Sequence, residues 1–235
     1  MQRHVDLGWH WRAYRARQRW QLTRQAIARW LDVPAALPTS LILLGGSAGW
    51  MMSGAFLARF DRILLIDLDP LAPWLMRWNH RHCLRSGAVE LKHWVGDAHE
   101  LLPKALAEDQ QACVLFDNFL GLDSMYTRDL QATAKRLRRV HEQVKGRWWG
   151  SVHDRLSGPG TSQWNCAPCW SQDWSLGAAQ PLPQQRMLQS VQAHGEWIDH
   201  GTEAVLPAHV SSVLIPWPIV AGRWHWLQAG WVPPQ

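Results

Sequence analysis

The sequence predicts an α/β protein with a Rossmann-like, doubly wound fold: a mostly parallel seven-stranded sheet with an antiparallel C-terminal strand pair and helices on both faces. Three observations support this fold class. Between residues 41 and 153, short aliphatic runs alternate with segments of helix length, as a parallel sheet with helical crossovers requires. Residues 41–69 read as strand, glycine-rich turn, helix and a second strand that ends on an acid. Two strand-like runs, 210–215 and 224–232, then close the chain.

The composition suits one packed core. Of the 235 residues, 47% are hydrophobic and 18% are charged, so the chain has enough apolar side chains to fold. It contains no run of about eighteen apolar residues, which predicts that no segment spans a membrane. The first residues lack the apolar stretch of a secretory signal, so we expect a cytoplasmic protein. The oligomeric state is not predicted.

The first expected element is a helix. Residues 9–31 place apolar side chains every three or four positions, which predicts one amphipathic helix that Pro34 and Pro38 bring to an end. The expected elements after it are strand 41–44, helix 50–59, strand 63–66, a helix from 69 to 85 opened by an Asp-Pro cap, strand 89–95 and a helix through Leu101 and Leu106.

The second half continues the alternation and then departs from it. Strand 113–116, helix 123–144 and strand 148–152 are expected in order. Residues 155–183 are rich in glycine, proline and tryptophan and have no period, which predicts an irregular functional segment. The final elements are helix 184–193 and strands 210–215 and 224–232, joined by residues 216–223.

Glycines and acids gather at the ends of the predicted strands, where ligands bind in an open parallel sheet. The glycines between Gly45 and Gly49 let the backbone approach a ligand, and the helix N-terminus that follows offers free N–H groups. Asp67 stands 22 positions after Gly45 and can accept hydrogen bonds from ribose hydroxyls. Ser47 and Trp50 break the G-x-G-x-x-G pattern, which disfavours a dinucleotide such as NAD or FAD.

Four strand ends over residues 38–153 resemble, in order and spacing, the motifs of class I S-adenosylmethionine-dependent methyltransferases. They are LILLGGSAG, Asp67 in LLIDLDP, Asp97 in VGDAHELL, and LFDNFLG. The resemblance implies S-adenosylmethionine as the cofactor. It implies contacts to the methionine part from Gly45, Gly46, Ser47 and Gly49, to the ribose from Asp67 and Leu68, to the adenine from Asp97 and Ala98, and a further cofactor contact from Asp117.

Two positions depart from the family pattern. The family often has an acid where Leu43 stands and a glycine where Ser47 stands. A related ligand, such as the decarboxylated cofactor, therefore stays open. The resemblance also implies one methyltransferase-like domain over residues 1–235, with a helical cover (1–40), a cofactor-binding core (41–153), an irregular lid (154–209) and a terminal strand pair (210–235).

Four residues are candidates for chemistry on the methyl acceptor. Methyl transfer requires an acceptor held in line with the methyl group and a base where the acceptor is protonated. Asp117, Asn118, His153 and Asp154 follow the fourth and fifth strands and are placed for this work. A pair that only caps neighbouring backbone is the alternative for His153 and Asp154.

The acceptor stays unidentified, as a small molecule or another partner. The segment DNFL lacks the prolines of nitrogen-directed family members with an Asn-Pro-Pro-Tyr type motif. RNA is an alternative acceptor, because residues 1–30 hold seven arginines against the single acid Asp6. A non-catalytic scaffold with the same fold is a second alternative.

The irregular segment adds two further groups. Cys166 and Cys169 form one C-x-x-C, a weak candidate for zinc or for a redox pair, and we expect a loop pair without metal. His200 follows Asp199 after a turn, and either points toward the site or belongs to a turn that Asp199 stabilises. The remaining cysteines, Cys83 and Cys113, are expected to be reduced thiols in the core.

Overall fold

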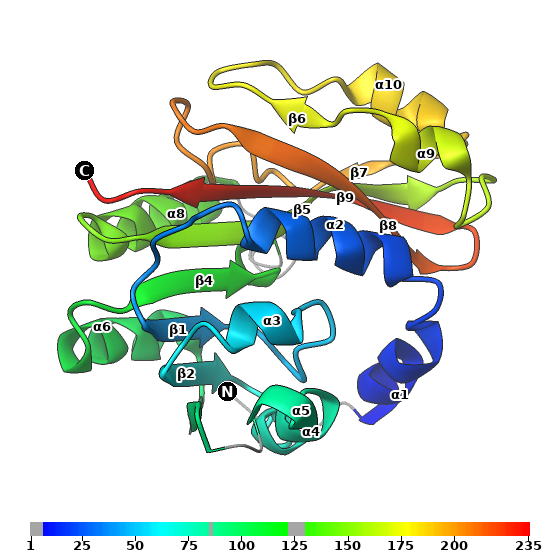
Figure 1. The fold of residues 1–235 in the computed structure, drawn as a ribbon. Helices are drawn as coiled ribbons and strands as arrows, with labels where there is room; N and C mark the ends of the chain where they lie inside the picture. Colours follow the sequence, from blue (N-terminus) through cyan, green and yellow to red (C-terminus); the bar gives the residue numbers. More distant parts are fainter. Residues whose placement is uncertain (1–6, 85–86, 122–129) are drawn as a thin grey trace.

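The computed structural model describes residues 7–84, 87–121 and 130–235, and these form one nine-stranded sheet. Five strands are parallel and stand in the order β3-β2-β1-β4-β5. The sheet continues through β9 and β8, each antiparallel to its neighbour (Figure 1). The predicted fold class is confirmed. The bounds of the seven main strands are β1 Ser40–Leu44, β2 Arg62–Asp67, β3 Glu90–Val95, β4 Cys113–Asp117, β5 Trp149–Pro159, β8 Ser212–Val220 and β9 Arg223–Val232.

Two short strands were not predicted. Strand β6, Ser175–Leu176, extends the sheet beyond β8, and β7, Ile198–Asp199, pairs with the far end of β5. Each has two residues, too few for a period of two to be visible in the sequence.

Helices cover both faces of the sheet, as the alternating side chains of its central strand show. Leu41 and Leu43 belong to one apolar cluster, and Ile42 and Leu44 to another on the opposite face. The first cluster is closed by α1 Leu7–Ala16, α2 Gln21–Leu31, α3 Gly54–Leu57, α4 Ala72–Asn79 and α5 Arg81–Leu84. The second is closed by α6 Ala98–Glu108 and α8 Leu130–Val144.

Two expected helices are each divided into two. The predicted helix 9–31 breaks at a turn before Trp20, whose indole Nε1 donates to the carbonyl of Pro218 at 3.1 Å. The helix expected from 69 to 85 breaks at His80, whose ring turns back to the carbonyl of Gly49. At both breaks a side chain contacts a residue far away in the sequence. Helical periodicity carries no information about such contacts, so the sequence did not predict the breaks.

The helix expected over 50–59 is wrong in length. Only the single turn of α3 is helical, and Ser53 caps it by accepting from the amide of Phe56 at 3.1 Å. Trp50 and Met52, which precede it, are buried in extended or turn conformations. The glycine-rich turn therefore does not lead directly into a helix, and no helix N-terminus lies immediately after it.

Strand β5 is longer than the predicted 148–152. Its first residues pair with β4 as far as Asp117↔Val152, whereas β9 pairs with its other edge from Trp149 to Pro159. His153 and Asp154 consequently lie inside a strand, just past the point where β4 ends. Strand β8 likewise continues through Val220, so the predicted connection 216–223 shortens to a tight turn.

The segment expected to be irregular is partly ordered. Residues up to 159 belong to β5, and a short helix, α9 Ala167–Ser171, follows. The helix expected over 184–193 is α10, Gln184–Ser190. These elements pack around a third apolar cluster that includes Trp174 and Trp226. The expected helix 123–144 is α8 from residue 130, and its start lies outside the described residues. In the part of the chain that the structure describes, no helix is both long and apolar enough to cross a membrane.

Candidate functional site

The glycine-rich turn after β1 takes left-handed backbone at three positions. Gly45 has a φ of 72°, Gly49 of 65°, and Ser47, a non-glycine, of 47°. A Cβ on Gly45 would lie 3.0 Å from the carbonyl oxygen of Asp117, so the turn passes directly against the end of β4. The sequence requires glycine at this point for two reasons: the backbone conformation and the close approach of a neighbouring strand.

Asp67 at the end of β2 holds the turn in place. Its Oδ2 accepts from the amide of Ser47 at 2.8 Å, and its Oδ1 accepts from the amide of Asp69 at 2.9 Å. The hydrogen bond from the Ser47 amide to this carboxylate stabilises the left-handed conformation of Ser47. Asp67 and its neighbour Leu68 are partly buried, so both remain accessible at the rim of the turn.

Asp97 follows β3 and is the N-cap of α6. Its Oδ1 accepts from the amide of His99 at 2.9 Å, and Ala98 is buried beneath it. The ring of His99 lies 4.7 Å from that of Phe119, which follows β4. Flat rings therefore stand beside Asp97, on the side where the resemblance expects an adenine.

Asp117 ends β4 and lies beside Asp67. Burial and, to a lesser degree, the negative charge of Asp67 raise the pKa of Asp117 to about 7. Burial also raises the pKa of Asp67, against the hydrogen bonds from the Asp69 and Ser47 amides. Two carboxyl groups in one partly dehydrated space make a site that favours a cation.

His153 and Asp154 are not brought together, because neighbours in a strand point to opposite faces. His153 is fully buried, its Nδ1 lies 3.0 Å from Ser151 Oγ, and burial lowers its pKa to about 3, so it is neutral. Asp154 is joined instead to Asn118, whose Nδ2 donates to Asp154 Oδ2 at 3.1 Å and whose Oδ1 accepts from the Asp154 amide.

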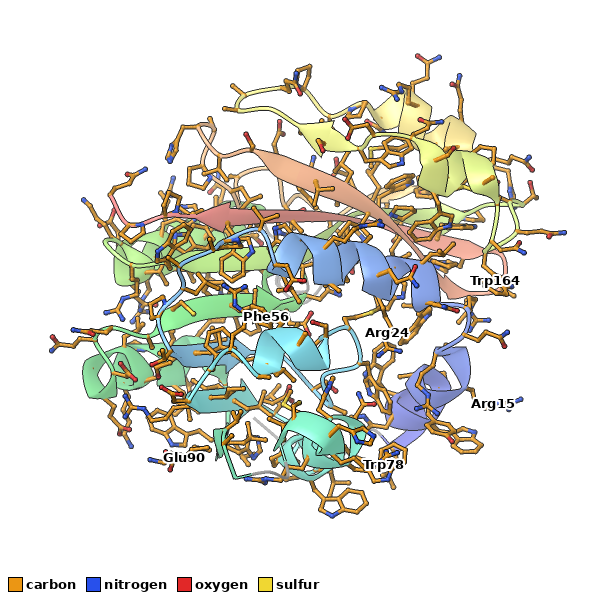
Figure 2. All side chains as sticks on the ribbon, viewed as in Figure 1. Arg15, Arg24, Phe56, Trp78, Glu90 and Trp164 are labelled. Carbon is orange, nitrogen blue, oxygen red and sulfur yellow. A yellow bond between two sulfur atoms is a disulfide. The ribbon has the colours of Figure 1, made fainter. Side chains whose placement is uncertain are left out.

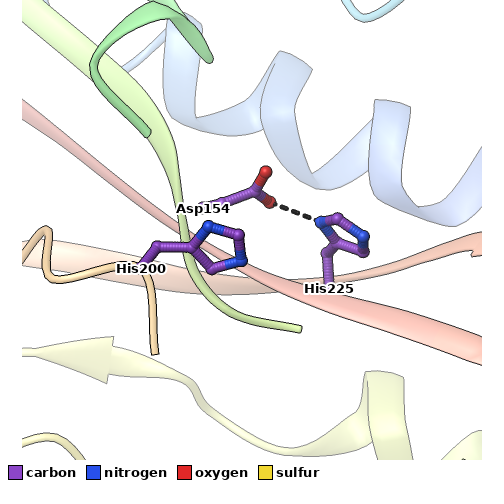
Figure 3. Close-up of side chains that lie close together, drawn as sticks. All are labelled: Asp154, His200 and His225. Carbon is purple, nitrogen blue, oxygen red and sulfur yellow. Dashed lines mark hydrogen bonds and ion pairs between the residues drawn. The ribbon is translucent and has the colours of Figure 1, made fainter. Parts of the chain in front are cut away.

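Asp154 also joins a pair of histidines that the sequence did not connect. His225 Nδ1 lies 2.8 Å from Asp154 Oδ1, and His200 stands on the other side of the carboxylate (Figure 3). Burial would raise the pKa of Asp154, but the hydrogen bond and charge of His225 hold it below its usual value. The carboxyl group is therefore ionised at neutral pH.

Two further histidines fix the surroundings of the turn. His10 of α1 contacts Asp69 through Nε2, while its Nδ1 accepts from Trp50 Nε1 at 3.2 Å. His80 contacts the Gly49 carbonyl at 2.9 Å. Their partners lie 59, 40 and 31 positions away, so no local pattern marks them. The α1 contact brings the predicted helical cover to the end of β2.

A pocket of about 580 Å³ opens between α1 and the β8–β9 hairpin. Figure 2 shows Arg15 on the outer side of α1 and Trp78 on neighbouring α4. The lining combines indole rings, guanidinium groups and one imidazole: Trp9, Trp11, Trp20, Arg12, Arg15, Arg19, Arg223 and His225, with Ile219 and Val220. The pocket is thus basic and aromatic.

The cysteines fall into two groups. Cys166 and Cys169, expected as a loop pair without metal, form a disulfide at the start of α9, so these two weak candidate metal ligands are bonded to each other and lie at a helix rather than in a loop. The C-x-x-C opens a helix, a position that the proline-rich sequence around it concealed. Cys83 and Cys113 are outside the disulfide, as expected; Cys113 is buried and Cys83 is half-buried.

No protein-family model and no curated protein sequence matches the chain. Among solved structures, it is similar to magnesium protoporphyrin IX methyltransferase from Synechocystis, with a TM-score of 0.49, 9% identity, and 98% of this chain and 90% of that one covered. It is also similar to a Burkholderia thailandensis O-methyltransferase family protein, with a TM-score of 0.46 and 16% identity, and 94% of this chain and 58% of that one covered. A third similar structure is a Geobacter sulfurreducens SAM-dependent methyltransferase, solved with S-adenosyl-L-homocysteine. Its TM-score is 0.37 at 15% identity, and 57% of this chain and 48% of that one are covered. The match thus spans about half the length of the last two proteins. Likeness at this level does not establish an activity, which has to be inferred from the chain's own residues.

Proposed function

We propose that this protein is an S-adenosylmethionine-dependent methyltransferase. The observation that carries the proposal is the pair of strand-end carboxyl groups, Asp67 and Asp117, beside the left-handed turn at Gly45. S-adenosylmethionine has a sulfonium and an ammonium charge and a ribose diol, and two neighbouring, partly buried carboxyl groups suit both features. When bound, it supplies an activated methyl group.

The residues of the chain fit the parts of this cofactor. Gly45, Gly46, Ser47 and Gly49 present backbone without bulky side chains to the methionine part, and Asp67 with Leu68 holds the ribose. Asp97 and Ala98 lie beside the His99 and Phe119 rings, where the adenine would stack. The hydrogen bond from the Ser47 amide to the Asp67 carboxylate explains how a serine occupies a glycine position of the family pattern.

Asp117 is the residue that we propose accepts a proton from the methyl acceptor. A pKa of about 7 lets the carboxylate accept a proton at neutral pH and release it again after the reaction. Asn118 holds the adjacent backbone by its two contacts with Asp154. His153, buried and neutral, supports the strand from the other face.

We propose further that the acceptor is an anionic aromatic small molecule that enters the pocket beside α1. Guanidinium groups bind carboxylates in a forked geometry, and indole rings stack on flat rings. His225 of the pocket bonds Asp154, and Asp154 bonds Asn118, the residue that follows Asp117 in the chain. In this proposal the chain is one methyltransferase-like domain, in which α1 and α2 cover the site.

Calorimetric titration with S-adenosylmethionine and S-adenosylhomocysteine tests the cofactor. The wild-type chain should bind both, and Asp67→Asn should weaken binding at least tenfold, because a charge-assisted hydrogen bond contributes about 1.5–3 kcal/mol. Asp61→Asn is the matched control, since Asp61 is exposed before the opposite end of β2. Absence of binding by the wild-type chain would refute the proposal.

The acceptor is tested separately, by quenching of tryptophan fluorescence with 4-hydroxybenzoate. Arg15→Gln should weaken binding roughly tenfold, whereas Arg138→Gln, on the exposed face of α8, should not. If the probe does not bind but an RNA oligonucleotide does, with an affinity that falls steeply with salt, the acceptor is RNA instead.

A further inference from the structure

Three metal-ligating side chains meet in the interior, away from the residues assigned to the cofactor. Asp154 comes from β5, His200 follows β7, and His225 comes from β9. Each offers one ligand atom, and the three atoms all lie within 4.8 Å of one another. Figure 3 shows the imidazole rings on either side of the carboxylate, with His225 bonded to it.

One nitrogen in this group is buried without a partner. His200 is 3% exposed, and its Nε2 lies 3.0 Å from Ser157 Oγ. Its Nδ1 has no hydrogen-bond partner among the residues that the structure describes. With Nε2 donating its proton to Ser157, Nδ1 keeps a lone pair directed at the cluster, the form in which an imidazole binds a metal ion.

The carboxylate of Asp154 is also held from outside the cluster. Asn118 Nδ2 donates to Asp154 Oδ2 at 3.1 Å and leaves Oδ1 toward the histidines. Such contacts orient the ligand atoms of a metal site. The carboxylate accepts a hydrogen bond from outside the cluster, and the second nitrogen of a histidine donates one to a group outside it. The partly exposed His225 lines the pocket beside α1, which gives an ion a path to the site.

We propose that Asp154, His200 and His225 bind one divalent transition-metal ion, for which Zn²⁺ fits best. Two imidazoles and one carboxylate suit Zn²⁺ and its first-row neighbours and do not suit Ca²⁺ or Mg²⁺, which prefer oxygen ligands. Binding requires His225 in the tautomer that carries its proton on Nε2, so that Nδ1 binds the ion in place of its hydrogen bond to Asp154. Three protein ligands leave at least one coordination position for water or another ligand.

Calorimetric titration of Zn²⁺ into the full, chelator-treated chain tests the site. It is performed without reductant, so that Cys166 and Cys169 stay bonded. One equivalent should bind, and Co²⁺ in its place should give a visible d–d absorption band. His200→Ala should weaken binding by more than about 100-fold, and Ser157→Ala by roughly tenfold, as outer hydrogen bonds usually do.

His194→Ala is the matched control, because His194 is an exposed histidine of the same region. It should bind Zn²⁺ like the wild-type chain. Circular dichroism establishes that each variant is folded, and Ser157→Ala keeps the test valid if His200→Ala is not. Absence of a stoichiometric ion, or equal affinity in wild type, His200→Ala and Ser157→Ala, would overturn the proposal and leave the three residues as a hydrogen-bonded network. The outcome does not depend on S-adenosylmethionine binding.

Discussion

The raised pKa of Asp117 lowers the stability of the folded chain at neutral pH and also suits the residue to proton transfer. Below about pH 4 the carboxyl group is protonated in both the folded and the unfolded chain, and the cost is absent. As the pH rises toward the folded pKa of about 7, the unfolded state ionises first and the folded state loses stability. The same property lets Asp117 exchange a proton with an acceptor near neutral pH.

Replacing Asp117 should therefore separate stability from activity. Asp117→Asn should be more stable than the wild type at pH 8, on the order of 3 kcal/mol, and equal to it near pH 3.5. Methyl transfer should be lost, since the amide accepts no proton. Urea unfolding at the two pH values measures the difference, and a variant less stable than the wild type at pH 8 would contradict the assignment.

Gly45 is a residue whose role can be isolated with a matched glycine. In Gly45→Ala the new Cβ meets the Asp117 carbonyl at 3.0 Å and the Phe119 Cβ at 3.2 Å, with φ at 72°. We expect a loss of roughly 2–4 kcal/mol and weaker cofactor binding. Gly146 has a φ of 78° and nothing within 4 Å, so Gly146→Ala should cost only about 1–2 kcal/mol. Equal losses in denaturant unfolding would show that the turn does not press on β4.

At the scale of elements, one buried histidine of α1 contacts the segment that follows β2 and the turn that follows β1. His10 lies between Asp69 and Trp50, and Asp69 is itself 8% exposed. Removing the imidazole leaves a buried carboxylate without this partner, which costs about 1–3 kcal/mol.

His10→Ala should loosen α1 more than the rest of the molecule. Hydrogen exchange should rise across residues 7–16 while β1 and β4 stay protected, and cofactor affinity should fall because the cover opens. Trp11→Ala serves as the control, as Trp11 is 61% exposed on the same helix. Unchanged exchange of α1 in His10→Ala would show that other contacts hold the helix.

The central strands could be predicted from the sequence because they are buried on both faces. The run Leu41 to Leu44 and its partners have no polar alternation to obscure them, and their order follows from right-handed crossovers. The strand-end acids Asp67 and Asp117 could be predicted for the same reason, since each ends such a run, whereas Asp97 follows Gly96 after the less buried β3.

The missed features depend on contacts between distant residues. Strand β5 extends past Val152 only because β9 pairs with it, and His225 reaches Asp154 only through that pairing, 71 positions away. His80 breaks its helix to reach Gly49. Helical periodicity and capping signals describe neighbours along the chain, so they contain no information about these breaks and contacts.

At the scale of the whole molecule, the third apolar cluster is separate from the two that flank the central sheet. It packs around Trp174, Met187 and Trp226, and it includes the buried Cys169 of the Cys166–Cys169 disulfide. A unit with its own small core can open without unfolding the sheet.

The double variant Cys166→Ser with Cys169→Ser should show this independence. Loss of the short covalent loop should destabilise the segment by about 2 kcal/mol, so amide exchange should rise across residues 167–190. Strands β1, β2 and β4 should exchange as in the wild type. Uniformly faster exchange would mean that the chain unfolds as one cooperative unit.

The central claim, that the ends of β1 to β4 hold an adenosyl cofactor, is tested most directly by a crystal structure with S-adenosylhomocysteine. We expect its ribose hydroxyls on Asp67, its adenine beside Ala98 and Phe119, and its amino acid part over the turn from Gly45 to Gly49. A ligand bound elsewhere, or no ligand at saturating concentration, would contradict the account.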